Sequence, residues 1–272
     1  YFLSVGRLIP YKRVDLAVHL YGHPADMDPI MEIARRRGLL VVEDACLALG
    51  AEYKGHWCGT MGQMGVYSFA PRKMLGGAGN GGAVVTCDPE LDRRLRMLRG
   101  YGLSQALTEM PISSRLQQPY LPHDVEGYNL RLDGLNAAMV SVKLPHLHEW
   151  LAHRRAVADR YAAHFSGTAV VTPQVLPGCR HSFRNYAVQL PHRDAVRAYL
   201  REQGIVSSVL YAPPVHLQPV YRHLGLGPGS FPVAEELASR ILCLPMYPGL
   251  SMEAVDEIAG AVLEGLLRAG AA

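Results

Sequence analysis

Two residues of the sequence, Asp44 and Lys73, have the side-chain types and the positions to hold a charged ligand together. Asp44 follows the apolar run "LLVVE" at 39–43, and Lys73 comes shortly after "VYSFA" at 66–70. Short apolar runs of this kind predict strands buried on both faces. Ligands of open α/β sheets bind at the carboxyl ends of such strands, and a carboxylate there is costly to bury without a cation. We therefore expect both side chains to share one site.

The chemistry that needs this pair of side chains is that of pyridoxal phosphate. A lysine holds this cofactor through a Schiff base, and its protonated ring nitrogen needs a carboxylate partner so that the ring can withdraw electrons. Taken alone, Lys73 would be interpreted as a solvated loop lysine. Its place just after a buried strand, together with Asp44 at the end of another strand, favours the cofactor site.

Gly77, Gly79 and Gly82, which follow Lys73, have the spacing G-x-G-x-x-G. A dinucleotide-binding loop needs a strand before such glycines and a helix that begins on them. Here the residues after Gly82 read "AVVT", which is typical of a strand, and the next helix is expected only from Pro89. We therefore predict a close-packed turn between two strands, folded around whatever Lys73 holds.

The composition argues against several other classes of function. The chain has 272 residues, of which 49% are hydrophobic, and its formal net charge of +3 is too small to suggest a nucleic-acid partner. No apolar run approaches the length of a membrane span, so no membrane partner is expected. The five cysteines are far apart and form no cluster with metal-ligand spacing. We therefore expect no metal site, and reduced thiols in a cytoplasmic compartment.

Helices and strands alternate in the first half of the chain, which predicts an α/β layer with a mostly parallel sheet. Further elements expected there are a helix from Asp28-Pro29 to Gly38, a strand at 82–86, and a helix from Asp88-Pro89 to Gly100. A helix from about Asp133 carries Leu135, Met139 and Val142 as its apolar stripe, and Pro145 kinks or breaks it.

The second half repeats strand and helix on a smaller scale, after a long helix that ends near Phe165. Strands are expected at 186–190, 205–210 and 241–245, and helices at 194–203 and around Val255, Ile258, Val262 and Leu266. We therefore expect a large α/β part up to about residue 145, followed over 146–272 by a connecting helix and a small C-terminal α/β domain.

The stretch from "VVEDACLALGAEYKG" through "YSFAPRKMLGGAGNGGAVVTCDPEL" resembles the core of the DegT/StrS-type sugar aminotransferases. The likeness runs from about His19 to the C-terminus, and it includes "HLYGHPADMDPI", "GYNLRLDGLNAA", "VKLPHLHEW", "PPVHLQPVY" and "LPMYPGL". This family implies the aspartate aminotransferase fold, with a partial type I large domain at 19–145 and the small domain after it. It also implies pyridoxal phosphate as the cofactor.

The resemblance implies a role for each matching residue. Lys73 would be the Schiff-base lysine and the acid and base that moves the proton at the reacting carbons. Asp44 would pair with the pyridinium nitrogen, and Ser68, five residues before the lysine, would donate a hydrogen bond to the cofactor phosphate. Asn129 in "GYNLR" resembles an asparagine that reaches the phosphate from the partner subunit, which implies a homodimer with shared active sites.

Arg184 and His216 fall in stretches that face the substrate in such enzymes, although a packing or surface role is equally open for both. The activity implied is transfer of an amino group from glutamate or glutamine to a nucleotide-linked keto sugar. Family members that act as dehydratases carry histidine in place of the lysine, so Lys73 favours transamination. The alternatives are an inactive remnant of the fold or a dimerising partner, and, less favoured, a glycosyltransferase fragment.

The glycosyltransferase alternative depends on the first residues, "YFLSVGRLIPYKRVDLAV", at 1–18. They resemble a loop of retaining glycosyltransferases in which Arg7 and Lys12 would bind a donor diphosphate. Family members also carry a longer N-terminal stretch that builds part of the cofactor site. We therefore expect a chain truncated at its N-terminus, with residues 1–18 as a foreign segment and a boundary near Val18-His19.

Overall fold

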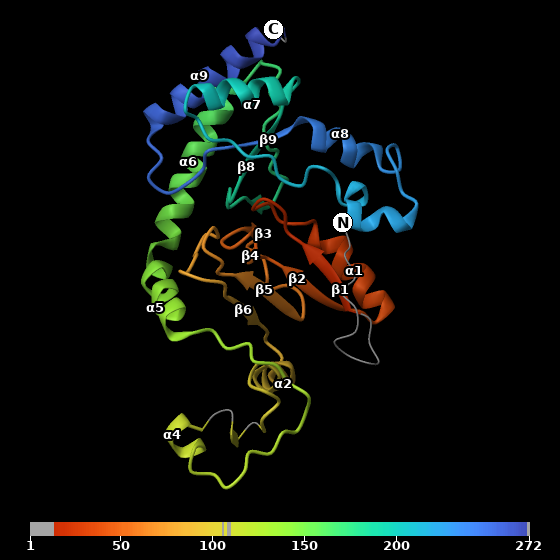
Figure 1. Ribbon diagram of the computed structural model, residues 1–272, viewed down its shortest axis with the longest axis vertical. Coiled ribbons are helices and arrows are strands. Elements are labelled where there is room, and N and C mark those ends of the chain that lie inside the picture. Colours follow the sequence, from red (N-terminus) through yellow and green to blue (C-terminus); the bar gives the residue numbers. More distant parts are fainter. Residues whose placement is uncertain (1–13, 105, 108–109, 271–272) are drawn as a thin grey trace. The chain divides into compact units, whose positions relative to one another are not determined.

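A computed structural model describes residues 14–104, 106–107 and 110–270 of the chain (Figure 1). These residues form two compact units. The first contains the described residues up to Leu20 and Pro24–Leu147, and the second contains Tyr21–His23 and the chain from His148 onward. Arg7 and Lys12 lie outside the described residues.

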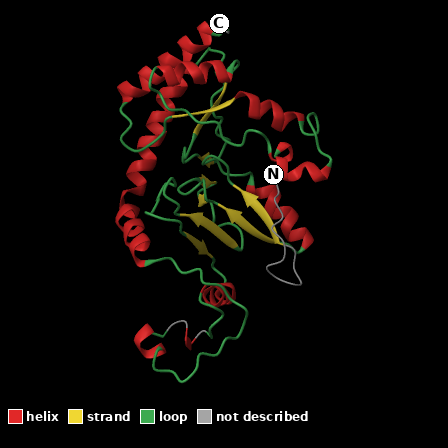
Figure 2. Cartoon of the chain, viewed as in Figure 1, coloured by secondary structure: helices red, strands yellow, loops and turns green. Residues whose placement is uncertain are grey.

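The first unit is built on a four-stranded sheet with the order β1-β2-β5-β6 (Figure 2). The strands are β1 (Val14–Val18), β2 (Leu40–Asp44), β5 (Met64–Ser68) and β6 (Gly82–Val85). β1, β2 and β5 are parallel, and β6 is antiparallel to β5. The predicted α/β class with a mostly parallel sheet is therefore confirmed. β1 consists of the last five residues of the segment that resembles a glycosyltransferase, so these residues are part of this sheet.

The described helices of the first unit include three that the sequence predicts and the short α4, for which no helix was expected. They are α1 (Met27–Arg37), α2 (Pro89–Arg99), α4 (Ile112–Arg115) and α5 (Gly134–Lys143), and a small hairpin joins β3 (Glu52–Tyr53) to β4 (His56–Trp57). α1 ends at Gly38, whose φ of 62° is left-handed and suits glycine. α2 begins after Asp88, whose carboxylate accepts hydrogen bonds from two backbone N–H groups of the first turn.

The second unit packs helices on a two-stranded antiparallel sheet of β8 (Tyr186–Gln189) and β9 (Ile241–Leu244). After the 3₁₀ turn η1 (Leu144–His146), its elements are α6 (Leu147–Phe165), β7 (Cys179–Arg180), α7 (Arg193–Glu202), η2 (Val215–Leu217), η3 (Pro219–Leu224), α8 (Pro232–Arg240) and α9 (Met252–Arg268). The core includes Tyr161, Val188 and Leu242, all fully buried. The four apolar residues predicted to share one face of the last helix are all buried in this core.

Two details of the predicted elements are wrong. The apolar stripe of α5 faces outward, because Leu135 is 81% exposed and Val142 is 72% exposed, whereas Asn136 and Val140 are buried. The run 205–210 forms no regular strand: Ser208 makes an isolated bridge to Cys243, and Val206 is 85% exposed. Pro145 does break the helix as predicted, since it lies in η1 between α5 and α6.

Candidate functional site

Asp44 and Ser68 lie at the carboxyl ends of neighbouring parallel strands. Asp44 is the last residue of β2 and pairs in register with Val66 of β5, two residues before Ser68 at the end of β5. Register partners and residues two positions apart on a strand share one face of a sheet. The side chains of Asp44 and Ser68 therefore lie on the same face at the same edge, and both residues are partly exposed there.

The opposite face of β2 carries a different carboxylate. Glu43 is fully buried and accepts hydrogen bonds from the backbone N–H groups of Gly59, Met61 and Gly62, and from Nε2 of His19 at 3.0 Å. Burial alone would raise the pKa of Glu43, but the hydrogen bonds from His19, Gly62 and Gly59 lower it below its usual value. The buried Glu43 carboxylate thus links His19 to the backbone of residues 59–62 beneath the site.

Lys73 lies in the turn that joins β5 to the antiparallel strand β6. Its backbone N–H donates to the carbonyl of Ala70 over 2.8 Å. The turn is closed by two further hydrogen bonds, from Gly77 N–H to the carbonyl of Phe69 at 2.8 Å and from Phe69 N–H to the carbonyl of Gly81 at 2.7 Å. The glycines therefore form the predicted close-packed turn between two strands, and the dinucleotide-loop interpretation is excluded.

The thiol of Cys46 lies within electrostatic reach of both charges of the site. Burial raises the pKa of Cys46 to about 12, Asp44 adds to this rise, and Lys73 opposes it. The backbone N–H of Cys46 also donates to Oδ1 of Asp44 at 3.0 Å. Cys46 therefore lies beside Asp44 at the end of β2, with Lys73 among the charges that act on its thiol.

The donor set of this edge fits pyridoxal phosphate. Within the described part of the chain, neither Asp44 nor Lys73 has an ion-pair partner, so the carboxylate and the ammonium are both available to a ligand. Oδ2 of Asp44 can accept the proton of a ring nitrogen, and the hydroxyl of Ser68 can donate to a phosphate oxygen. These three residues could therefore hold the cofactor at its nitrogen, its reacting carbon and its phosphate.

Asn129 is not brought to this edge by the path of the chain. β6 runs antiparallel to β5, so α2 starts from the opposite end of the sheet, and Asn129 forms a bridge with Gly100 just after α2. Asn129 is exposed. Its predicted contact with the phosphate of a partner subunit stays a prediction.

Arg184 and His216, the predicted substrate residues, both belong to the second unit. Burial lowers the pKa of Arg184 from its usual value. His216 is largely buried, with Nε2 at 3.0 Å from Oε1 of Glu235 and its ring 4.8 Å from the ring of Phe231. These contacts give His216 a packing partner and an ionic partner, and its substrate role stays a prediction.

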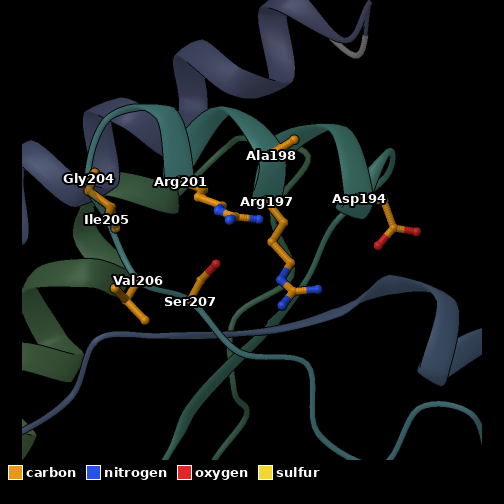
Figure 3. A pocket seen from close by; sticks show the side chains of 8 residues that line it. All are labelled: Asp194, Arg197, Ala198, Arg201, Gly204, Ile205, Val206 and Ser207. Atoms are coloured by element: carbon orange, nitrogen blue, oxygen red, sulfur yellow. The ribbon is translucent and has the colours of Figure 1, made fainter.

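A separate hollow of about 540 Å³ lies on the second unit beside α7 (Figure 3). Its lining includes Arg197 and Arg201, one turn apart on α7, and Ser207. None of the six predicted site residues lines it. The hollow is therefore built from a different set of residues than the predicted cofactor and substrate site.

Four residues that hold the site in place were not predicted from the sequence. His19 and Glu43 are both completely buried, and Asn136 and Lys143 of α5 contact the glycine turn that carries Lys73. The available signal for Asn136 was a polar residue three positions after the N-cap Asp133, within the mostly apolar run 134–140.

The fold is an α/β sheet that carries Asp44 and Ser68 at the carboxyl ends of neighbouring parallel strands, with Lys73 in the turn after β5. The chain belongs to the DegT/DnrJ/EryC1/StrS aminotransferase family, whose sequence profile matches residues 8–263. The match begins within the segment 1–18, and it gives no support to a glycosyltransferase interpretation of that segment.

Curated relatives and solved structures agree with this family. The chain is 41% identical to the erythromycin biosynthesis sensory transduction protein EryC1 of Saccharopolyspora erythraea, covering 95% of this chain and 67% of that protein. It is 40% identical to a dTDP-3-amino-3,4,6-trideoxy-alpha-D-glucose transaminase of Streptomyces venezuelae, covering 94% of this chain and 64% of that protein. The crystal structure of DesV from S. venezuelae superposes with a TM-score of 0.83 at 40% identity, covering 94% of this chain and 66% of DesV. The chain therefore spans about two thirds of the length of these proteins.

No helix among the described residues is long and apolar enough to cross a membrane.

Proposed function

We propose that this chain carries out amino-group transfer to a nucleotide-linked keto sugar with pyridoxal phosphate, and that glutamate or glutamine is the amino donor. The observation that supports this most directly is the position of Asp44 and Ser68 at the carboxyl ends of neighbouring parallel strands, with Lys73 in the turn that follows β5. Relatives that are 41% and 40% identical are named for a UDP-linked and a dTDP-linked sugar, which supports a nucleotide-linked substrate.

Each residue of the edge has a defined task in this proposal. The bound cofactor supplies an electrophilic carbon and a ring that stabilises negative charge on the adjacent carbon. Asp44 holds the proton on the ring nitrogen, because a carboxylate beside it keeps the protonated form favoured. Nζ of Lys73 would hold the cofactor and would serve as the acid and base that accepts and returns the proton at the amino-donor carbon. The hydroxyl of Ser68 fixes the phosphate and so the orientation of the ring.

Two further residues, both in the second unit, are proposed to contact the substrate. We propose that the guanidinium of Arg184 binds an anionic group of the substrate, since guanidinium is well suited to carboxylate and phosphate. His216 is proposed as a second substrate contact. Both proposals come from the positions of these residues in the family pattern.

We further propose a homodimer in which Asn129 reaches the cofactor phosphate of the partner subunit. The outward face of α5 supports it, because Leu135 and Val142 are highly exposed, and Leu130 just before this helix is 67% exposed. Large apolar side chains exposed together on one helix and just before it favour a site of protein association. A two-fold symmetric pair would cover this face and would complete each site with residues from both subunits.

The cysteines support a cytoplasmic location for this activity. All five are free thiols: Cys46, Cys58, Cys87, Cys179 and Cys243. Free thiols persist in reducing compartments.

The proposal is tested by the absorption spectrum of the purified chain with added pyridoxal phosphate. We expect a visible band from cofactor linked to a lysine, loss of this band in Lys73→Ala, and its retention in the control Lys54→Ala, which removes an exposed lysine paired with Asp28. A wild-type chain that shows no such band at saturating cofactor would contradict the proposed function.

A further inference from the structure

We infer that Asn136 and Lys143 of α5 are positioning residues that clamp the glycine turn and thereby hold Lys73 at the reacting edge. The inference rests on the proposed function for the role of Lys73. The clamp itself depends only on contacts within the first unit.

The two side chains point the same way because of their spacing. Asn136 and Lys143 are seven residues apart, which is two helical turns, so they share one face of α5. Val140, between them on this face, is 8% exposed. The inward face of α5 therefore has a polar group on each side of a buried valine, and the apolar residues Leu135 and Val142 lie on the outward face.

Asn136 is 5% exposed and is held in one orientation by the start of its own helix. Its Nδ2 donates to Oδ2 of the N-cap residue Asp133 at 2.7 Å, which leaves Oδ1 directed at the turn. Oδ1 accepts the backbone N–H of Gly79 at 2.9 Å. The Asn136 amide thus provides an acceptor for the partly buried N–H of Gly79, which would cost free energy if it had no hydrogen-bond partner.

Lys143 holds the turn at a second point. Its Nζ donates to the carbonyl of Gly76 at 2.5 Å. Gly76 is itself confined, because a Cβ at this position would lie 2.2 Å from the carbonyl oxygen of Pro71. The clamp therefore contacts the turn at Gly76 and Gly79, the second of which lies 57 residues before Asn136 in the sequence.

Gly77 also lies close to the side-chain amide of Asn136. A Cβ on Gly77 would lie 2.6 Å from Oδ1 of Asn136, closer than real Cβ contacts allow. The turn is therefore shaped so that its backbone can approach the amide of α5. Lys73 lies three residues before Gly76, on the same turn, so the position of its backbone depends on this approach.

The consequence concerns the amine of Lys73. A reacting group must be held close to one geometry, and a displacement of about 1 Å costs on the order of 100-fold in rate. Without the clamp, the turn keeps its closing hydrogen bonds at Phe69 but loses its support between residues 76 and 79. We expect Lys73 to sample more positions, while Asp44 and Ser68 on the strands stay in place.

The first measurement needs no cofactor. Hydrogen exchange of the full chain, followed by mass spectrometry, compares the wild type with Asn136→Ala and Lys143→Met. We expect exchange in peptides covering 73–82 to be about 10-fold faster in both variants, and unchanged over Tyr186–Gln189 in the second unit. Lys54→Met is the matched control, because it removes an exposed lysine that contacts Asp28 instead of the turn. Exchange at 73–82 that equals the control in both variants would overturn the clamp.

The second measurement tests positioning with the cofactor bound. Addition of L-glutamate or L-glutamine removes the visible band, and the rate of this half-reaction is measured against pH. We expect the two variants to bind pyridoxal phosphate within about threefold of the wild type, with the half-reaction about 10- to 100-fold slower and the midpoint of its pH profile shifted. Lys143→Arg, which keeps a donor for Gly76, should recover most of the rate.

The outcomes separate the two levels of the proposal. A half-reaction rate and pH profile equal to those of the wild type in both variants would overturn the positioning role, whatever their thermal stability. A wild-type chain that binds no pyridoxal phosphate would overturn the proposed function, and the exchange data would then still decide the clamp.

Discussion

His19 and Glu43 form a completely buried pair in which Nε2 of the imidazole lies 3.0 Å from Oε2 of the carboxylate. Nδ1 of His19 accepts the backbone N–H of Ala25, so the ring proton is on Nε2 and is donated to Glu43. The backbone N–H of His19 also donates to the carbonyl of Asp44 at 3.1 Å. The chain that follows β1 is thus fixed to the end of β2, directly beneath the proposed cofactor site.

Glu43→Gln should lower the free energy of unfolding by about 3 kcal/mol. The carboxylate accepts four hydrogen bonds, and an amide would present N–H groups to part of that set of donors and leave them unpaired. Denaturation with urea measures the change. The control Glu126→Gln alters an exposed loop carboxylate and should stay within about 0.5 kcal/mol of the wild type. Equal stability of both variants would contradict the structural role of the buried pair.

The stability of the chain should fall between pH 7 and pH 5 partly because of His181. Burial lowers the pKa of His181 from 6.5 to about 3, with further contributions from His23 and Arg155. In the unfolded chain His181 is protonated below pH 6.5, whereas in the folded chain it stays neutral until about pH 3. The contribution of neutral, buried His181 to the free energy of unfolding is therefore fully present above pH 6.5 and declines as the pH falls. The expected loss from this group between pH 7 and pH 5 is about 2 kcal/mol.

His181→Asn tests this pH dependence. Nδ1 of the histidine accepts the backbone N–H of Phe183 at 2.7 Å, and the amide oxygen of asparagine can accept the same hydrogen bond without titrating. The variant should therefore lose about 2 kcal/mol less than the wild type between pH 7 and pH 5 in parallel denaturation curves. Identical pH slopes for the two proteins would show that His181 is protonated in the folded chain.

Asp44→Asn should slow the half-reaction with L-glutamate or L-glutamine by about 100-fold. The amide keeps the shape of the side chain but loses the charge that favours a protonated ring nitrogen. The visible band should remain, because Lys73 is unchanged. Asp159→Asn, an exposed substitution on α6, serves as the control and should react at the wild-type rate. Wild-type rates in Asp44→Asn would contradict the proposed pairing with the ring nitrogen.

Gly77→Ala should destabilise the first unit by about 1–3 kcal/mol, because its Cβ would lie 2.6 Å from Oδ1 of Asn136. In the background of Asn136→Ala the obstructing oxygen is gone, so the added cost of Gly77→Ala should shrink by at least about 0.5 kcal/mol. A double-mutant cycle in urea measures this coupling. Strictly additive effects would mean that the two residues do not meet.

Elements that a local residue pattern determines were predicted well from the sequence. The strands around residues 40–44 and 82–85 and the last helix are confirmed, because apolar runs and a helical stripe determine them locally. The exposure of the apolar stripe of α5 could not be predicted, since periodicity tells which residues share a helix face and not whether that face is buried. Residues 205–210 have strand-like composition, yet only Ser208 pairs with a neighbouring strand residue there.

The residues of the candidate site were likewise predicted only in part from the sequence. Asp44 and Ser68 could be placed at one edge from the sequence, because the carboxyl ends of adjacent parallel strands meet there. The contacts that hold the site in place could not be predicted from the sequence, since His19 lies 24 residues before Glu43 and Asn136 lies 57 residues after Gly79. Contacts at such separations depend on the tertiary fold and leave no periodic trace in the chain.

The alternation of β2 has a consequence for how this protein can change over evolution. Glu43 and Asp44 are consecutive, yet Glu43 is buried in the interior and Asp44 borders the proposed cofactor site, because successive residues of a strand point to opposite faces. A single inserted or deleted residue in this strand would interchange the two carboxylates and leave each in the wrong environment. The length of this strand therefore decides which of the two carboxylates is buried.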